Sequence, residues 1–407
     1  MTKENSKLII LLDQVVLSGS NFFINIILAR SLGLDSFGVF SLYWITILFF
    51  LSIQQAAIIA PMYSIEAREN VKINSIYQVN LFHLLLTFLS AIMMAIFLLV
   101  YSYYSSGFDF SLKLVIVILF SAIFLFQDYA RRVLFLTKRY WTALLVDIIA
   151  YLGFLLTLLF INKDTFNEIN IFIIPLITFS FSFLYFIVTT NLYHISISSD
   201  IKEKFEEYWD FSKWLSFSNI LQWFSGNIFV LIGTFTLGPW VAGLIRIFQN
   251  LMGLFSIFFH TMENFIPIDA SNIFSSNGLH SMIRFLNKIF GQGLLFLGLL
   301  ILMIYFINPY YIINMIYGNQ YIEYGSLLYI YLIIYFFLFS NLLLRYFFRT
   351  LANTKVIFYS YIFSAIFSFI IAWPLVNIFE MLGIVLGTLF SQIVIFVYLV
   401  AKAVKYD

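Results

Sequence analysis

The stretch that decides the fold is Asn21–Trp44, NFFINIILARSLGLDSFGVFSLYW. It contains the end of one apolar segment, a short polar break with glycine, and the start of the next apolar segment. About 205 residues later a similar break returns, because Thr236-Leu237-Gly238 resembles Ser31-Leu32-Gly33. In both places a second glycine, Gly38 or Gly243, follows the first after the same five-residue step.

A second repeat has a slightly different offset. Arg132-x4-Thr137-Lys138 matches Arg349-x4-Thr354-Lys355. Each match is short, but the matches occur in the same order and at similar spacing. The pattern therefore predicts two similar halves, an organisation that many transporters share, with the binding site between the halves.

The composition predicts a membrane protein. Hydrophobic residues make up 62% of the chain and charged residues 10%, against roughly 45–50% and 25% in soluble domains. The first apolar run contains Asp13 and Gln14 and continues past the length of a signal peptide, so we expect a first membrane helix and no cleavable signal. The chain has no cysteine, which excludes disulfides and cysteine metal sites. We expect no metal, no cofactor and no nucleic-acid partner.

The apolar segments predict an all-α membrane protein with about twelve transmembrane helices, since a bilayer core of about 30 Å needs roughly 20 apolar residues per helix. The expected spans are 8–29, 38–62, 76–102, 112–136, 140–161, 171–194, 213–235, 240–265, 281–307, 324–347, 356–378 and 383–401. They divide into an N-terminal six-helix bundle (1–194), a cytoplasmic amphipathic linker (195–212) and a C-terminal six-helix bundle (213–407).

The basic residues predict the orientation in the cell membrane. With the N-terminus inside, 18 of the 22 basic residues lie at the cytoplasmic side, as the positive-inside rule requires, and both termini are cytoplasmic. The exceptions are Arg30, Lys113, Lys163 and Arg246. Between spans six and seven, Ile201, Phe205 and Tyr208 or Trp209 share one helical face, which favours a helix on the inner membrane surface. A plain solvated linker is the alternative.

Three motifs resemble one transporter family. Ile27–Gly38 (ILARSLGLDSFG) and Ile316–Tyr321 (IYGNQY), together with the two Arg-x4-Thr-Lys segments, are similar to Wzx-type polysaccharide flippases of the multidrug/oligosaccharidyl-lipid/polysaccharide exporter superfamily. The resemblance implies two pseudo-symmetric six-helix bundles around a V-shaped central cavity. It also implies a substrate, an oligosaccharide on undecaprenyl diphosphate, which is moved to the outer leaflet for O-antigen or capsule synthesis. A polymerase and glycosyltransferases of the same pathway would be partners, beside the membrane lipids.

Such a substrate needs cations for its diphosphate and polar groups for its sugar. Arginine suits phosphate because its planar fork binds two oxygens at once, and polar residues inside membrane spans are usually functional. Polar residues of span one, from Asp13 to Asn25, step by three or four and share a face. The predicted substrate-binding residues are Arg246, Arg30, Asn21, Asn25, Gln54, Asn219, Gln222 and Asn250. The alternatives are interfacial anchoring for Arg30, ion pairing or snorkelling for Arg246, and hydrogen bonds between packed helices for the amides.

Acids and histidines within the spans are candidates for coupling transport to an ion gradient, since a buried carboxylate can load and release a proton near neutral pH. We name Asp147, Asp13 and His83 first. Asp128 is expected to pair locally with Arg131 or Arg132 at helical spacing. His260 and Glu263 are weaker candidates near a cytoplasmic end. We expect the basic cluster 131–139 mainly to set topology, with recruitment of an anionic head group as a compatible role.

No catalytic residue is expected. The chain lacks the GxSxG, P-loop and HExxH patterns, and every predicted outward loop is short. Two alternatives to the flippase remain: a drug or cation antiporter of the same superfamily, and a membrane-embedded glycan polymerase, transferase or ligase. The intramembrane Arg246 disfavours the antiporter, and the short outward loops disfavour the enzymes.

Overall fold

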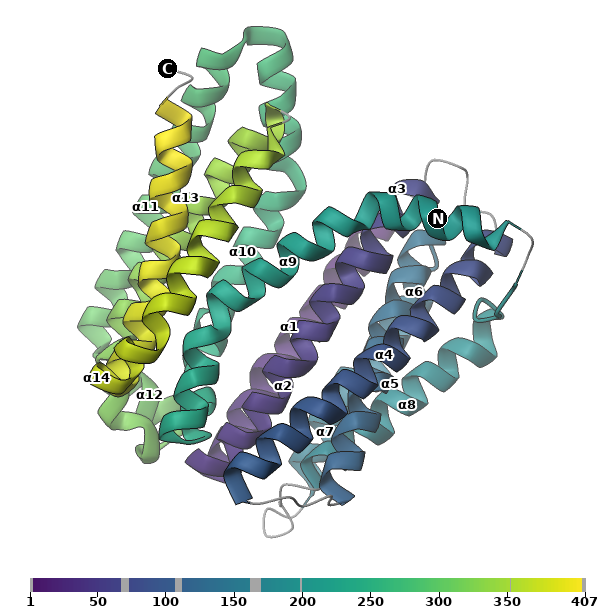
Figure 1. The fold of residues 1–407 in the computed structure, drawn as a ribbon, viewed down its shortest axis with the longest axis horizontal. Coiled ribbons are helices and arrows are strands. Elements are labelled where there is room, and N and C mark those ends of the chain that lie inside the picture. Colours follow the sequence, from purple (N-terminus) through teal and green to yellow (C-terminus); the bar gives the residue numbers. More distant parts are fainter. Residues whose placement is uncertain are drawn as a thin grey trace. The chain divides into compact units, whose positions relative to one another are not determined.

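The computed structural model describes residues 3–66, 73–106, 112–161, 170–197, 200–351 and 353–404. Every regular element in these ranges is a helix, as Figure 1 shows. Four of the 22 basic residues counted above lie outside the described part: Arg68, Lys72, Lys163 and Lys405. The side chains of His260 and Glu263 also lie outside it.

Ten segments of the described chain are long and apolar enough to cross a bilayer. The elements up to residue 190 are α1 (Lys3–Leu32), α2 (Leu34–Gln54), η1 (Gln55–Ile59), α3 (Ala60–Ile65), α4 (Ile73–Ser106), α5 (Leu112–Leu136), α6 (Tyr140–Asp147), η2 (Ile148–Leu152), α7 (Gly153–Phe160) and α8 (Asn170–Thr190). The π-helical turns η1 and η2 continue α2 into α3 and α6 into α7.

The second part of the chain contains longer helices. Its elements are α9 (Ile201–Leu237), α10 (Trp240–Asn277), α11 (Leu279–Ile307), α12 (Pro309–Tyr317), the 3-10 turn η4 (Asn319–Tyr324), α13 (Leu327–Thr350) and α14 (Thr354–Ala403). The 50 residues of α14 correspond to about 75 Å of helix, more than twice a bilayer core. The backbone breaks at Glu380 (φ 48°, ψ −126°), so α14 provides two spans. The all-α fold is confirmed, and dividing α14 raises the ten candidate spans to eleven. The remaining predicted span, 240–265 in α10, stays a prediction.

The chain forms two compact units. Unit 1 comprises Met1–Leu32 and Phe40–Ile220. In it α5 packs against α4, α6 and α8, while α1 packs against α6, η2 and α7. Aromatic rings fill the space between α2, α5 and α8: Phe120 lies 6.0 Å from Trp44 and 5.7 Å from Phe179, between ring centroids.

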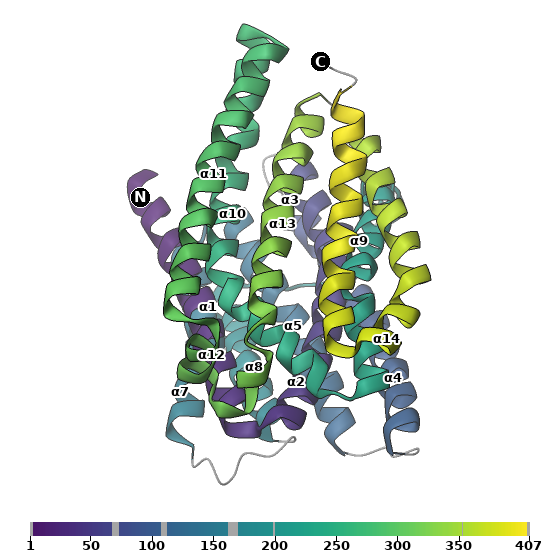
Figure 2. The same cartoon turned by 90° about the vertical axis from the view of Figure 1, so that its left-hand side faces the viewer.

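Unit 2 comprises Gly33–Val39 and Leu221–Asp407. Its helices α10, α11 and α13 pack in contact, and α14 packs along α13, as Figure 2 shows. Ring stacking reinforces these contacts. Phe248 on α10 lies 5.0 Å from Tyr331 on α13, and Phe290 on α11 lies parallel to Phe339 on α13.

The polar segment before the seventh span is helical from Ile201 and continues without interruption into that span. Its first turns belong to unit 1. Lys204 Nζ lies 2.9 Å from Oε1 of the fully buried Glu66, and the Tyr208 hydroxyl donates to the same oxygen at 3.0 Å. One face, with Tyr208, is buried, while Trp209 is 56% exposed. The position of this helix on the inner membrane surface remains a prediction.

The two glycines that the sequence repeat pairs lie against each other within unit 2. A Cβ on Gly38 would overlap the Pro239 carbonyl, and a Cβ on Gly243 would lie 3.0 Å from the Gly38 nitrogen. Small residues at such positions let helix backbones approach closely in a membrane. The first turn of α2 and the start of α10 therefore pack with backbone almost touching backbone, which explains why both halves carry a glycine there.

Replacing Gly38 by Ala should destabilise the protein. The added methyl group meets backbone atoms that cannot rotate away, and overpacking of this kind costs about 1–3 kcal/mol. We expect a lower thermal unfolding midpoint of the purified protein in detergent. Gly226→Ala is the matched control in unit 2, because its Cβ would meet no atom within 4 Å. Equal midpoints for the two variants would contradict the close packing.

Candidate functional site

The membrane-spanning part of unit 1 contains a buried arginine between two carboxylates. Arg131 Nη2 lies 2.6 Å from Asp13 Oδ2, and Arg131 Nε lies 2.7 Å from Asp147 Oδ2. The side chains are 9% (Arg131), 1% (Asp13) and 0% (Asp147) exposed. We call Asp13, Arg131 and Asp147 the charge triad. Asp13 lies on α1, Arg131 on α5 and Asp147 at the end of α6, so a single guanidinium connects three helices.

The triad has one more negative than positive charge when all three groups are ionised. Gln127, one turn before Arg131 on α5, donates a hydrogen bond to Asp147 Oδ1 at 2.7 Å. The π-helical turn η2 begins directly after Asp147, and such turns occur frequently at functional sites. The arrangement can take up one proton or one small cation, because either would neutralise the remaining charge.

A second polar cluster lies in the same unit. Gln54, which is fully buried, donates to Asp128 Oδ2 at 3.3 Å, and its Oε1 lies 3.2 Å from His83 Nε2. The His83 ring stacks on Tyr129 at 4.0 Å. Arg132 Nε lies 3.5 Å from Asp128 Oδ1. Gln54 is thus hydrogen-bonded within the helix core and has no surface exposed to a ligand.

The structure corrects one expectation and confirms another. The basic cluster was expected mainly to mark the cytoplasmic side, but Arg131 lies buried and pairs with carboxylates of two other helices. Asp128 pairs with Arg132, as helical spacing predicts. Glutamine and aspartate at 127 and 128, one turn before two arginines, were the sequence signal of a buried network.

In unit 2 a small group of polar side chains lies near the start of α10. Arg246 is 8% exposed, and Asn250 lies one turn further on the same helix. Asn250 Nδ2 donates to the Tyr317 hydroxyl at 2.8 Å, and Tyr321 lies edge-on to Tyr317 at 6.4 Å. Burial raises the pKa of Tyr317, so its hydroxyl stays protonated. The sequence did not predict this link between α10 and the turn after α12.

The other predicted residues lie at separate places in the two units. Arg30 is exposed in the last turn of α1. Asn25 Nδ2 donates to the Asn21 carbonyl at 2.7 Å, one turn earlier on the same helix. Asn219 donates to the Ser52 carbonyl at 3.3 Å, while Gln222 is exposed on α9. Their roles in substrate binding remain predictions.

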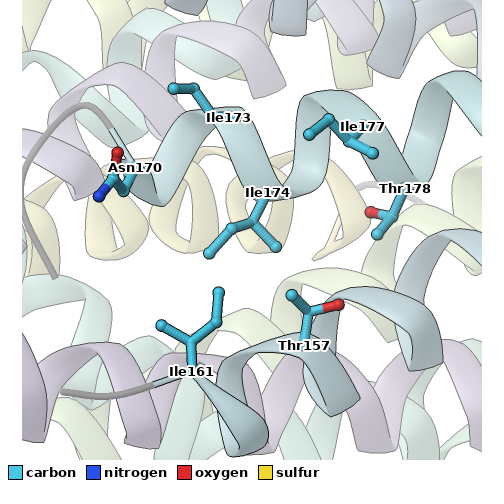
Figure 3. Close-up of a pocket in the computed structure, with 7 residues that line it drawn as sticks. All are labelled: Thr157, Ile161, Asn170, Ile173, Ile174, Ile177 and Thr178. Atoms are coloured by element: carbon cyan, nitrogen blue, oxygen red, sulfur yellow. The ribbon is translucent and has the colours of Figure 1, made fainter. Parts of the chain in front are cut away.

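A cavity of about 310 Å³ lies between α7 and α8 in unit 1, shown in Figure 3. It is lined by Thr157, Ile161, Asn170, Ile173, Ile174, Ile177 and Thr178. The hydroxyls of Thr157 and Thr178 donate to carbonyls of their own helices. The lining residues that the structure describes include no charged group for a polar head group.

Solved structures of transporters share this fold. A multidrug resistance MATE family transporter of the MOP superfamily, in an inward-facing conformation, aligns with a TM-score of 0.70 at 13% identity over 98% of both chains. Lipid II flippase MurJ, in an inward closed conformation, aligns with a TM-score of 0.72 at 13% identity, over 98% of this chain and 87% of MurJ.

A third similar structure is a MOP superfamily transporter from Pyrococcus furiosus Vc1, for which the reverse polarity of the binding pocket suggests a different function. It aligns with a TM-score of 0.60 at 13% identity over 97% and 94% of the two chains. No protein-family model and no curated protein matches the sequence. The chain is thus a multi-pass membrane protein with the fold of MATE transporters and MurJ.

Replacing Arg131 by Met should strongly destabilise the protein, because it leaves two neighbouring buried carboxylates without a cation. Removing one partner of a buried ion pair costs about 3–5 kcal/mol. We expect a large loss of folded, monodisperse protein after extraction in detergent. The control is Arg132→Met, on the same helix, whose side chain is 27% exposed. Equal yields for both variants would show that the triad does not hold unit 1 together.

Proposed function

We propose that the protein is a flippase that moves an oligosaccharide linked to undecaprenyl diphosphate from the cytoplasmic to the outer leaflet, for synthesis of a surface polysaccharide such as O-antigen or capsule. The observation that carries the proposal is the buried Arg246 beside Asn250 and Tyr317, in a fold that is shared with a lipid II flippase. The resemblance of Ile27–Gly38 and Ile316–Tyr321 to Wzx-type flippases supports the same substrate class.

The energetics of Arg246 favour an anionic substrate. An arginine within a membrane span costs about 2.5–3.5 kcal/mol on insertion scales, and such residues usually have a function. A diphosphate is a suitable ligand, since the guanidinium can bind two of its oxygens at once and the bonds are charge-assisted. Asn250 supplies an amide on the same helical face, one turn from Arg246. In this proposal Arg246 holds the diphosphate, while the amides and Arg30 contact the sugar or the departing head group.

The proposal includes a topology. In this proposal residues 1–194 and 213–407 are two pseudo-symmetric six-helix bundles, and residues 195–212 are the linker between them. Both termini lie in the cytoplasm, and the protein resides in the cell membrane. The polymerase and glycosyltransferases of the same pathway would supply and consume its substrate.

A drug or cation antiporter is the second candidate, because the fold is shared with MATE transporters. Deleting the gene separates the two candidates. A flippase deletion should accumulate carrier-linked glycan that only enzymes on the cytoplasmic side can reach. Altered drug sensitivity with normal glycan export would support the antiporter. A polymerase or ligase would instead leave single repeat units in the outer leaflet.

Arg246→Ala should reduce glycan export at least tenfold at normal protein abundance, since one charge-assisted contact contributes about 1.5–3 kcal/mol. Arg246→Lys should have intermediate activity, because lysine keeps the charge but loses the planar fork. Export is measured as surface glycan per molecule of protein in a complemented deletion strain. Arg284→Ala, at an exposed position on α11, is the control. Parental export by both Arg246 variants would exclude a required phosphate contact.

The charge triad is the candidate for ion coupling, because two acids share one arginine. Asp147→Asn removes the surplus negative charge, so transport by this variant should no longer respond to an imposed pH gradient. The measurement is uptake of lipid-linked substrate in proteoliposomes with and without the gradient. Asp128→Asn, which changes the neighbouring pair with Arg132, should retain the response. An unchanged response of Asp147→Asn would remove the triad from the coupling mechanism.

A further inference from the structure

Arg345 is a second arginine within the membrane-spanning part of unit 2. It lies on α13, five residues before the helix ends at Thr350, or about 8 Å from that end at 1.5 Å per residue. Its Nη1 donates to the Tyr361 hydroxyl on α14 at 2.7 Å. The neutral tyrosine hydroxyl accepts a hydrogen bond but does not balance the charge.

Within the described chain no carboxylate pairs with Arg345, and its buried Nε has no acceptor. One turn earlier on the same face of α13, Asn341 Nδ2 donates to the backbone oxygen and to Oε1 of Gln392, at 3.1 and 3.2 Å. The buried Asn341 Oδ1 has no donor among the same residues. A guanidinium donor and an amide acceptor thus lie one helical turn apart, and each lacks a partner. Buried polar groups usually have a partner.

The sequence repeat shows how the two units differ here. Asp128 precedes the repeated arginine of the first half, Arg132, by four residues, and Arg345 precedes Arg349 of the second half by four. In unit 1 this position carries a carboxylate that pairs with Arg132. In unit 2 the same position carries a guanidinium, so two cations follow each other at that spacing.

We propose that Arg345, Asn341 and Tyr361 form a binding site for the phosphate group of a membrane lipid that carries a hydroxyl next to the phosphate. The remaining Nη donors of the partly exposed Arg345 side chain bind two phosphate oxygens, and such paired charge-assisted bonds are the geometry that guanidinium favours. Asn341 Oδ1 accepts a hydrogen bond from the hydroxyl. Tyr361 orients the guanidinium through its contact with Nη1.

Two lipids have this chemistry, an anionic phospholipid with a glycerol head group and the sugar-bearing diphosphate of the proposed substrate. The second source rests on the proposed function, and the first does not. If the diphosphate is the ligand, Arg345 would bind it at a depth different from that of Arg246, because Arg345 lies near the end of α13 and Arg246 lies near the start of α10.

The test measures lipid binding to the purified full-length protein in neutral detergent by native mass spectrometry. The probes are phosphatidylglycerol, phosphatidylcholine as the zwitterionic comparison without a head-group hydroxyl, and a short-chain polyprenyl diphosphate that carries a sugar. Arg345→Gln should weaken binding of at least one anionic probe by about 10- to 100-fold, the loss of one charge-assisted contact. The control is Arg349→Gln, which removes an exposed charge one turn away.

The outcomes separate the sources. Loss confined to phosphatidylglycerol identifies a resident phospholipid, loss confined to the diphosphate identifies the substrate, and loss of both supports the shared phosphate chemistry. Unchanged affinity for both probes, or equal losses with Arg349→Gln, would overturn the inference. If Arg345→Gln does not fold, Arg345→Lys tests the planar fork instead, with a several-fold loss expected and parental affinity as the contrary result. These measurements are independent of export by the Arg246 variants, so either proposal can fail alone.

Discussion

The constraint on which the structure depends is the free-energy penalty of placing a charged side chain inside a membrane. Ion pairs with Asp13 and Asp147 offset this penalty for Arg131. The same contacts hold α1 and α6 against α5. A buried ion pair is weak evidence of stability by itself, because desolvation offsets much of the attraction. We expect its value to be specificity, since the three charged groups meet only when α1, α5 and α6 pack in this arrangement. Elsewhere in unit 1 the buried Glu66, after α3, is likewise paired, with Lys204 near the start of α9.

In unit 2 the charged side chains within the spans have different contacts. Asp128 of the first half is replaced at the repeat position by Arg345, whose described contact is a tyrosine hydroxyl. Arg246 lies buried next to the hydrogen bond between Asn250 and Tyr317. Among the described side chains, the buried carboxylates Asp13, Asp128 and Asp147 of unit 1 pair with arginines, while Arg246 and Arg345 bring positive charge into unit 2. A cationic half suits an anionic cargo.

The sequence predicted the fold well because composition, span length and the positive-inside rule all act locally. The segments 112–136 and 140–161 agree with the observed helices to within one residue, and the repeat at Gly38 and Gly243 reflects a real backbone contact. The site was harder to predict. The role of Arg131 depends on carboxylates 118 and 16 positions away in the sequence, and helical spacing reports only neighbours on one helix. The link between Asn250 and Tyr317 likewise requires a chain reversal through α12 and the turn after it.

The most direct test of the account is transbilayer movement in proteoliposomes that contain only this protein. A fluorescent oligosaccharide linked to a polyprenyl diphosphate is compared with the same oligosaccharide linked to the polyprenol without phosphate. Because the account assigns recognition to arginines, it predicts rapid movement of the diphosphate lipid and movement of the neutral analogue at the rate of protein-free vesicles. Equal movement of both lipids, or uptake of a small organic cation with neither lipid moved, would contradict it.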